Sequence, residues 1–287
     1  MSTGKVACPL CGSSRVAPLF TKRQTAYWAC AACTFRFATP DVNPNLTQTL
    51  DGYEDAYLQY LAPDASDSVN FEALYRWMAG LATLEGTRLL DVGAGSGKLV
   101  RFLRGRGIDA RGIEPSRALF DRFLAGHAEF TPVTLDQLHA SAPQTFDIVT
   151  AFDVIEHVPD PAGFLRAVST CLKPGGTFFA STPDVESLIA KLFGRRWHFY
   201  HAYHLSYLGP RTIARAAAPH GLRMFDLRHR GRLRSTAYMI RYAAETIGGI
   251  KAPRWARWFD RWYLPVNLFD TMYVAFRRDP GETPHQI

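Results

Sequence analysis

The chain has 287 residues, of which 47% are hydrophobic and 21% are charged, a composition that suits one large globular domain plus a small appendage. Its formal net charge is +7, and residues 195–261 alone hold 14 basic and three acidic side chains, which indicates either an anionic partner or a solvated, arginine-rich surface. No apolar run reaches the roughly 18 residues of a membrane span, and the N-terminus lacks the basic and apolar segments of a signal peptide, so we expect a cytoplasmic protein without a transmembrane segment.

Two CxxC pairs lie near the N-terminus. Cys8 and Cys11 form the first pair, and after 18 intervening residues Cys30 and Cys33 form the second. In a cytosolic protein this spacing favours one tetrahedral Cys₄ zinc site over disulfides. A module of this size has too little core to fold alone, so a bound metal would supply the folding free energy. We therefore predict a structural zinc ribbon over residues 1–40, and whether it also recognises a partner stays open.

A linker and two helical segments follow the ribbon. Tyr53, Tyr57 and Tyr60 have near-helical spacing within residues 41–70, and residues 71–84 have the pattern of an amphipathic helix.

A glycine-rich turn, DVGAGSG over residues 91–97, comes directly after a short apolar run. This order predicts a buried strand, a tight turn and a helix over 98–106. Glycine permits positive φ there and lets a ligand approach the backbone. A second strand over 110–113 ends at Glu114, about 20 positions after the turn, where an acidic side chain can accept hydrogen bonds from a ribose diol.

The remaining chain alternates between predicted helices and strands. Helices are expected at 116–124, 162–172, 188–194, 210–218, 238–247 and 253–263, and strands at 129–133, 146–151, 177–181, 221–228 and 269–277.

Four segments, in this order, resemble the class I S-adenosylmethionine (SAM)-dependent methyltransferases: DVGAGSG, GIEPS, FDIVTAFDVIEHVPDP and LKPGGTFFASTPD. The resemblance covers about residues 74–227. It implies an α/β fold, with a Rossmann-like seven-stranded sheet, helices on both faces and one of the last two strands reversed. The predicted organisation is a zinc ribbon at 1–40, a linker and helical cofactor cover at 41–70, a methyltransferase domain at 71–278 with inserted helices near 236–265, and a tail at 279–287. In the cover, Tyr53 and Tyr57 either pack internally or line the cofactor.

The resemblance also implies a SAM site at the carboxyl edge of the sheet, where α/β folds bind their ligands. The predicted cofactor-binding residues are Asp91, Gly93, Ala94, Gly95, Glu114, Pro115, Asp136, Phe152 and Asp153. Within this set, Asp136 is the acidic residue nearest to the expected position of the adenine amino group.

Two histidines are candidate catalytic bases. Methyl transfer from a sulfonium requires alignment of the nucleophile and, for an oxygen nucleophile, removal of its proton. Histidine suits that task because its ordinary pKa lies near neutrality. His157 follows the fourth predicted strand and His204 follows the fifth, so both can reach one cleft. The alternative for each is a structural hydrogen bond.

The order Asp153-x-x-Glu156-His157 resembles the ExxEH motif of ubiquinone-pathway and small-RNA O-methyltransferases. In those families the motif, together with a later histidine in the RNA enzymes, can hold a divalent metal near the acceptor hydroxyl. The resemblance implies a possible Mg²⁺ site at these three residues. In other relatives with a similar motif, the aspartate lies near the cofactor and the glutamate packs structurally.

An aromatic stripe near the C-terminus is interleaved with arginines. Its members, at helical spacing, are Trp255, Trp258, Phe259, Trp262 and Tyr263. Three interpretations stay open: a lid helix over the acceptor, a contact with an anionic membrane or lipid-linked substrate, and a nucleic-acid contact.

The sequence therefore favours SAM-dependent methylation of a small-molecule acceptor. Our leading hypothesis is O-methylation of a sugar or secondary metabolite, as in natural product biosynthesis, with a histidine base. One alternative is an RNA methyltransferase that binds RNA through its ribbon and basic C-terminal half. Another is a non-catalytic zinc-ribbon binding protein with a degenerate SAM fold.

Overall fold

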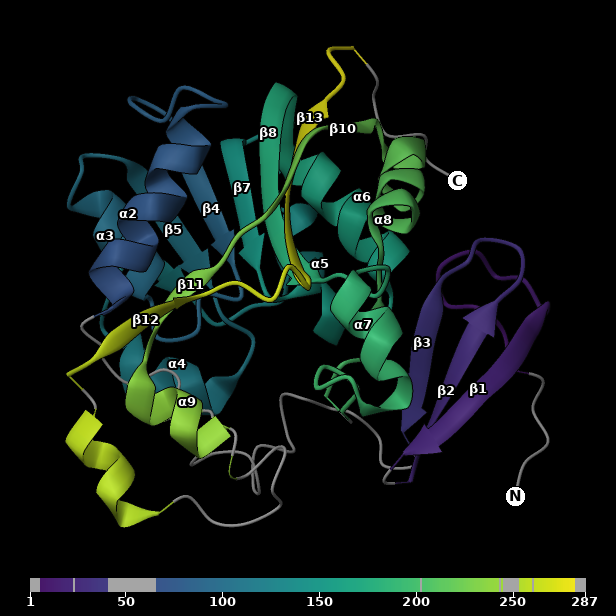
Figure 1. Cartoon of the computed structure of the whole chain (residues 1–287). Helices are drawn as coiled ribbons and strands as arrows, with labels where there is room; N and C mark the ends of the chain where they lie inside the picture. Colours follow the sequence, from purple (N-terminus) through teal and green to yellow (C-terminus); the bar gives the residue numbers. More distant parts are fainter. Residues whose placement is uncertain are drawn as a thin grey trace.

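A computed structural model describes residues 6–22, 24–40, 66–201, 203–242, 244, 253–259 and 261–281. These residues form a seven-stranded sheet flanked by helices and a smaller four-stranded sheet beside it (Figure 1). The predicted tyrosines at 53 and 57 lie outside the described residues. No helix in the described part is long and apolar enough to cross a membrane.

The seven-stranded sheet has the order β10-β13-β8-β7-β4-β5-β6. Its strands are β4 (Arg88–Val92), β5 (Asp109–Ile113), β6 (Phe130–Thr131), β7 (Phe146–Phe152), β8 (Leu172–Pro183), β10 (Leu222–His229) and β13 (Thr271–Arg278). Strands β4 to β8 pair in parallel, whereas β13 runs antiparallel to both of its neighbours. The predicted methyltransferase-type sheet, with one reversed strand, is confirmed.

Helices cover both faces of this sheet because its central strands are apolar on both sides. Leu89 and Leu90 of β4 point to opposite faces and belong to different core clusters. Helices α2 (Ser66–Ala79) and α3 (Lys98–Arg104) pack on the Leu89 side, and α6 (Pro161–Cys171) and α8 (Pro210–Ala217) pack on the other (Figure 1). The short helices α4 (Arg117–Phe123), α5 (Leu135–His139) and α7 (Leu188–Phe193) lie in the connections between strands.

The region after β10 differs from its prediction. The predicted helix 253–263 is only a 3₁₀ helix, η6 (Arg254–Phe259), followed by strand β12 (Tyr263–Val266). That strand pairs with β11 (Arg232–Ser235), which the sequence analysis missed, and α9 (Thr236–Tyr242) lies between them. The aromatics have helical spacing, but the pairing with β11 makes the chain extended from Tyr263 onward, so the helical part ends at Phe259.

The N-terminal ribbon consists of β1 (Val16–Lys22), β2 (Thr25–Cys30) and β3 (Arg36–Pro40), all antiparallel. A fourth strand, β9 (Ser206–Tyr207), comes from the larger domain, which contains the seven-stranded sheet, and pairs with β3. Phe35 and Phe37 of the ribbon are buried in the same core cluster as residues of α6 and α8. The ribbon is therefore docked on the domain, beside α7 in Figure 1.

Candidate active site

The glycine-rich turn after β4 has the backbone that the sequence predicted. Gly93, Gly95 and Gly97 all have positive φ, from 56° to 75°. The N–H groups of Gly93 and Ala94 both donate to the Ile113 carbonyl at 2.9 Å, which ties the turn to the end of β5. A Cβ on Gly93 would lie 2.8 Å from Val154 Cγ2, so the turn has no room for a side chain there.

Glu114 lies directly after β5 and spans the turn with its carboxylate. It is 5% exposed, and its two oxygens accept hydrogen bonds from the N–H groups of Gly95 (2.8 Å) and Ser116 (2.9 Å). Burial raises the pKa of this carboxyl, and the two amides oppose that rise. Each oxygen keeps a further lone pair, so the group can accept hydrogen bonds from a diol while held in place.

Asp91 lies behind the same turn, at the end of β4. Its side chain is 5% exposed and accepts a 2.7 Å hydrogen bond from Thr150 Oγ1. Burial raises the pKa of Asp91 to about 7, and the nearby Glu114 adds to the rise. The two acids thus form one buried region of carboxyl groups with raised pKa values behind the turn.

Phe152 ends β7 at the same edge of the sheet, and Asp153 follows it directly. Asp153 has φ of 57°, and its carboxylate accepts hydrogen bonds from Ser181 Oγ (2.7 Å) and Arg232 Nη2 (2.6 Å). Burial raises the pKa of Asp153, but the Arg232 guanidinium and Ser181 more than offset this, so the pKa is lowered. Asp153 is therefore an anchored anion.

Pro115 and Asp136 of the predicted cofactor set are both exposed. Asp136 lies in the first turn of α5, next to a capping box formed by Thr134 and Gln137. Their assignment to the cofactor stays a prediction.

His157 closes the short 3₁₀ turn η2 (Ile155–His157) after β7. Its Nδ1 lies 2.8 Å from the Tyr203 carbonyl, and because a carbonyl can only accept, Nδ1 carries the proton. The lone pair is then on Nε2. Burial lowers the pKa of His157, although the Tyr203 carbonyl and Asp153 oppose this, so the neutral form that a base requires predominates at pH 7.

His204 lies against His157, with ring centroids 4.8 Å apart. It is 5% exposed, and its Nδ1 is buried with no hydrogen-bond partner among the described residues. Burial lowers the pKa of His204 well below its usual range, and His201, whose ring is 3.9 Å away, lowers it further. The pair of candidate bases is thus a pair of neutral imidazoles.

A three-residue group in this region has the donor set of a metal site. Glu156, His157 and His204 each offer a ligand atom, and these atoms lie within 4.8 Å of one another. Glu156 Oε2, like His204 Nδ1, is buried without a partner in the part of the chain that is described. Such orphaned atoms fit a bound cation.

The predicted metal set of Asp153, Glu156 and His157 is therefore corrected by one residue. Asp153 is engaged by Ser181 and Arg232, because its left-handed backbone directs it toward β8 and β11, and His204 takes its place. One carboxylate with two imidazoles suits Zn²⁺, Mn²⁺ or Fe²⁺ better than Mg²⁺, which prefers oxygen ligands.

The four ribbon cysteines come together as predicted. Cys8 and Cys33 sulfurs are 3.6 Å apart, Cys11 and Cys30 sulfurs are 3.7 Å apart, and all four lie within 4.8 Å of one another. A tetrahedron with Zn–S bonds of about 2.3 Å requires sulfur separations of about 3.8 Å. The cluster therefore fits zinc.

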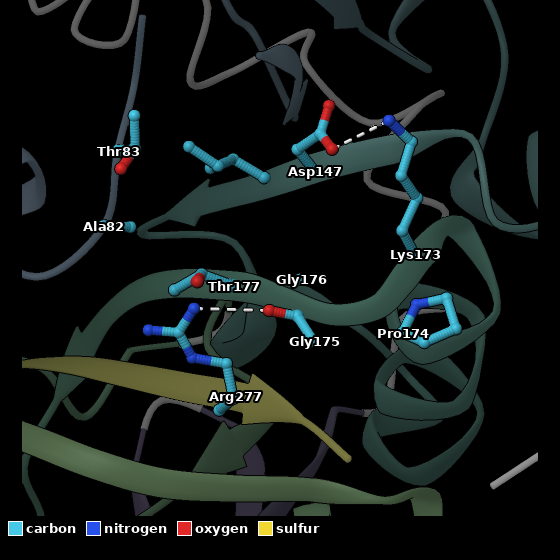
Figure 2. A pocket seen from close by; sticks show the side chains of 10 residues that line it. Ala82, Thr83, Asp147, Lys173, Pro174, Gly175, Gly176, Thr177 and Arg277 are labelled. Atoms are coloured by element: carbon cyan, nitrogen blue, oxygen red, sulfur yellow. Dashed lines mark hydrogen bonds and ion pairs between the residues drawn. The ribbon is translucent and has the colours of Figure 1, made fainter. Parts of the chain in front are cut away.

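A separate hollow of about 230 Å³ lies at the amino ends of β7 and β8 (Figure 2). An ion pair of Lys173 with Asp147 (2.7 Å) borders it, and Arg277 donates to the Gly175 carbonyl on its other side. Because the glycine-rich turn follows the carboxyl end of β4, this hollow lies at the opposite edge of the sheet from the predicted cofactor-binding residues.

Two site residues were missed by sequence reasoning. Arg232 and Ser181 hold Asp153 from 79 and 28 residues away. The arginine-rich composition around Arg232 was the one sequence feature that could have indicated a partner for Asp153. It did not indicate which of these arginines points toward the site.

Residues 56–227 match a family described as the methyltransferase domain. The ubiquinone biosynthesis O-methyltransferase of Ralstonia nicotianae is 39% identical over 112 residues, which are 37% of this chain and 47% of that protein. The enzyme of the same name from Thiobacillus denitrificans is 32% identical over 169 residues, 53% of this chain and 71% of that protein. The chain thus spans about half the length of the first of these relatives.

Solved structures show the same fold at lower identity. A chain from the complex between the Haloferax volcanii Trm112 methyltransferase activator and a methyltransferase matches with a TM-score of 0.56 at 17% identity, covering 83% of this chain and 100% of that one. Magnesium protoporphyrin IX methyltransferase from Synechocystis matches with a TM-score of 0.53 at 12% identity, covering 82% and 98%. At these identities the likeness establishes the architecture.

Proposed function

We propose that this chain, which belongs to the methyltransferase domain family, is a SAM-dependent enzyme that methylates a hydroxyl group of a small molecule. The observation that carries the proposal is the orientation of His157, whose Nδ1–H is held by the Tyr203 carbonyl so that Nε2 is a neutral acceptor. The relatives named O-methyltransferases support an oxygen nucleophile.

The cofactor would lie against the glycine-rich turn. Glu114 would accept hydrogen bonds from the ribose diol, and the turn between Gly93 and Gly95 would admit the cofactor close to its backbone. When bound, SAM supplies a methyl group on a sulfonium. The phenyl ring of Phe152 lies beside Tyr273, and the two rings would exclude water near this edge.

His157 Nε2 would take the proton of the acceptor hydroxyl as the oxygen attacks. The Tyr203 carbonyl would stabilise the imidazolium through Nδ1–H, and the neutral, buried His204 would add no competing positive charge. His157 is thus the base, and His204 packs beside its ring.

A divalent metal is a second candidate for the same place. Glu156, His157 and His204 would hold it, and the orphaned Glu156 Oε2 and His204 Nδ1 support this. Such an ion would lower the pKa of the acceptor hydroxyl. A histidine nitrogen that binds a metal cannot also accept a proton, so His157 is either the base or a metal ligand. The number of metal ions bound per chain, beyond the zinc of the ribbon, distinguishes these two mechanisms.

An apolar or lipid-linked acceptor is favoured by the surface of α7 and the following η3 turn (Gly194–Arg196). Large apolar side chains are exposed there: Leu188 (70%), Leu192 (70%) and Phe193 (56%). Lys191, Arg195 and Arg196 are also exposed. Apolar and cationic side chains together suit the surface of an anionic lipid layer.

That surface is tested by sedimentation with phosphatidylglycerol vesicles, with phosphatidylcholine vesicles for comparison. The double variant Leu188→Gln/Leu192→Gln should lose binding, while Leu19→Gln, on the exposed edge of the ribbon, should keep it. Equal binding by all three proteins would exclude α7 as the contact.

The RNA alternative has less support because several basic side chains in 195–261 are engaged within the fold. Arg230 donates to the Ala73 carbonyl, Arg232 pairs with Asp153, and Arg223 pairs with Asp279. Methylation of total RNA with a steep salt dependence would favour this alternative instead.

The main test is methyl transfer from labelled SAM to a panel of phenols, catechols and glycosides, with the product identified by mass. His157→Gln should reduce turnover by about a hundredfold or more, while S-adenosylhomocysteine (SAH) binds as before. Methylation of amines only, or full activity of the variant, would reject the hydroxyl assignment to His157.

A further inference from the structure

The ribbon is hydrogen-bonded directly to the segment that carries His204, one of the two candidate histidines. In the β3–β9 pair, Arg36 is opposite Tyr207 and Phe37 is opposite Ser206. The N–H of Ala38 extends this pairing by donating to the Leu205 carbonyl at 2.9 Å. Leu205 is the residue after His204, so the ribbon fixes the backbone beside one candidate site residue.

The same segment is bonded on its other side to the turn of His157. The Leu205 N–H donates to the Glu156 carbonyl at 2.8 Å, and His157 Nδ1 donates to the Tyr203 carbonyl at 2.8 Å. A continuous backbone path therefore leads from β3 through Leu205 to the turn η2. Tyr203, His204 and Leu205 lie between the two.

Side chains strengthen this junction at Tyr200. Lys22 Nζ donates to the Tyr200 carbonyl at 2.8 Å, and Arg36 Nη1 donates to its hydroxyl at 3.3 Å. The ring of Tyr27 packs on those of Tyr200 and Tyr207 with centroids 5.2 and 5.8 Å apart. These rings are buried, so the ribbon side of the histidine segment is solidly packed.

The cysteine cluster lies at the start of the same path. The Cys30 N–H donates to the Phe35 carbonyl at 2.8 Å and the Thr34 N–H to the Cys30 carbonyl at 2.9 Å, which closes the second CxxC turn directly before β3. Phe35 itself is fully buried against the domain. A metal on the four sulfurs would thus fix the position of β3.

We propose that the metal-filled ribbon is a positioning element of the active site, which holds the Tyr203–Leu205 segment and through it the tautomer and orientation of His157. The inference rests on the proposed function for its catalytic meaning, but its physical content does not require activity. A ribbon that only adds stability would leave the two imidazoles as they are whenever the domain is folded.

The experiment uses the full zinc-loaded chain and the variant Ala38→Pro. Proline keeps an extended backbone but lacks the N–H that reaches Leu205, and it leaves every cysteine and histidine in place. The matched control is Ala38→Gly, which weakens the strand but keeps that N–H. SAH titration of each protein checks that the predicted cofactor site is intact.

The readout is the long-range ¹H–¹⁵N spectrum of ¹⁵N-histidine-labelled protein at one pH, with signals assigned through His157→Gln and His204→Gln. We expect the wild type and Ala38→Gly to show His157 as a single Nδ1–H tautomer. Ala38→Pro should show a tautomer mixture at His157 and a shifted His204, with SAH affinity within about twofold of the wild type. Once an acceptor is known, turnover should fall while the KM for SAM stays unchanged.

Two results would overturn the proposal. Unchanged His157 and His204 signals in Ala38→Pro would show that the ribbon does not position them. A loss of SAH affinity in Ala38→Pro that parallels the change at the histidines would show a general loss of folding. If no hydroxyl acceptor is ever found, the proposed function fails, whereas the tautomer result still stands or falls by itself.

Discussion

The carboxylate of Glu114 is held in one orientation by the amides of Gly95 and Ser116. Glu114→Gln would place an NH₂ group opposite one of these N–H donors and remove the charge. We expect SAH affinity to fall about tenfold or more, the loss typical of a hydrogen bond to a charged group. Calorimetric titration measures this, with the exposed Glu85→Gln as control. Equal affinity in all three proteins would remove Glu114 from the cofactor site.

Asp91 gives the cofactor-free protein a predictable pH dependence. Burial raises its pKa to about 7, above the value near 3.9 of an unfolded chain. Between these values the folded chain holds a proton that the unfolded chain has released, so the free energy of unfolding falls as pH rises. Asp91→Asn cannot ionise. Its melting temperature should therefore fall less than that of the wild type from about pH 5 to pH 8, and parallel pH curves would contradict the assignment.

The junction between the glycine-rich turn and α3 depends on close packing as well as on backbone freedom. A Cβ on Gly97 would lie 2.6 Å from the Phe130 ring and 2.7 Å from Leu124. Gly107, just beyond α3, has a similar positive φ but nothing within 4 Å.

Alanine substitutions at Gly97 and Gly107 separate the cost of backbone strain from the cost of side-chain crowding. Gly107→Ala should cost about 1–2 kcal/mol of unfolding free energy, the cost of a left-handed alanine. Gly97→Ala should cost about 1–3 kcal/mol more, because its methyl also overpacks the turn. Urea denaturation of both variants measures the difference, and equal costs would mean that Phe130 and Leu124 yield without strain.

The whole molecule should unfold as one unit with its ribbon. Cys8 and Cys30 belong to the same core cluster as Leu208 and Ile213 of the domain. Removal of zinc by a chelator should therefore lower the melting temperature of a single calorimetric transition. Cys11→Ser should behave like the chelated protein even with zinc present. A separate low-temperature transition for the ribbon would contradict this.

Local sequence determined the glycine-rich edge of the sheet and the cysteine cluster. Asp91 and Glu114 are brought together by a strand, a glycine-rich turn, a helix and a second strand, all within a few tens of residues. The residue types of each of these elements favour its local conformation. The four cysteines likewise come together through two tight turns and a short antiparallel sheet. These features were predictable because near neighbours in the chain are also near neighbours in space.

Tertiary structure alone decided which further residues surround the two candidate histidines. Arg232 pairs with Asp153 across 79 residues, and His204 replaces Asp153 beside Glu156 and His157. The strand pair β3–β9 joins residues about 170 positions apart, and β9 itself is only two residues long. Such contacts form between backbone groups and buried rings that still lack partners when the helices and strands pack. No periodicity or motif in the sequence indicates these long-range contacts, so they are seen only in the folded molecule.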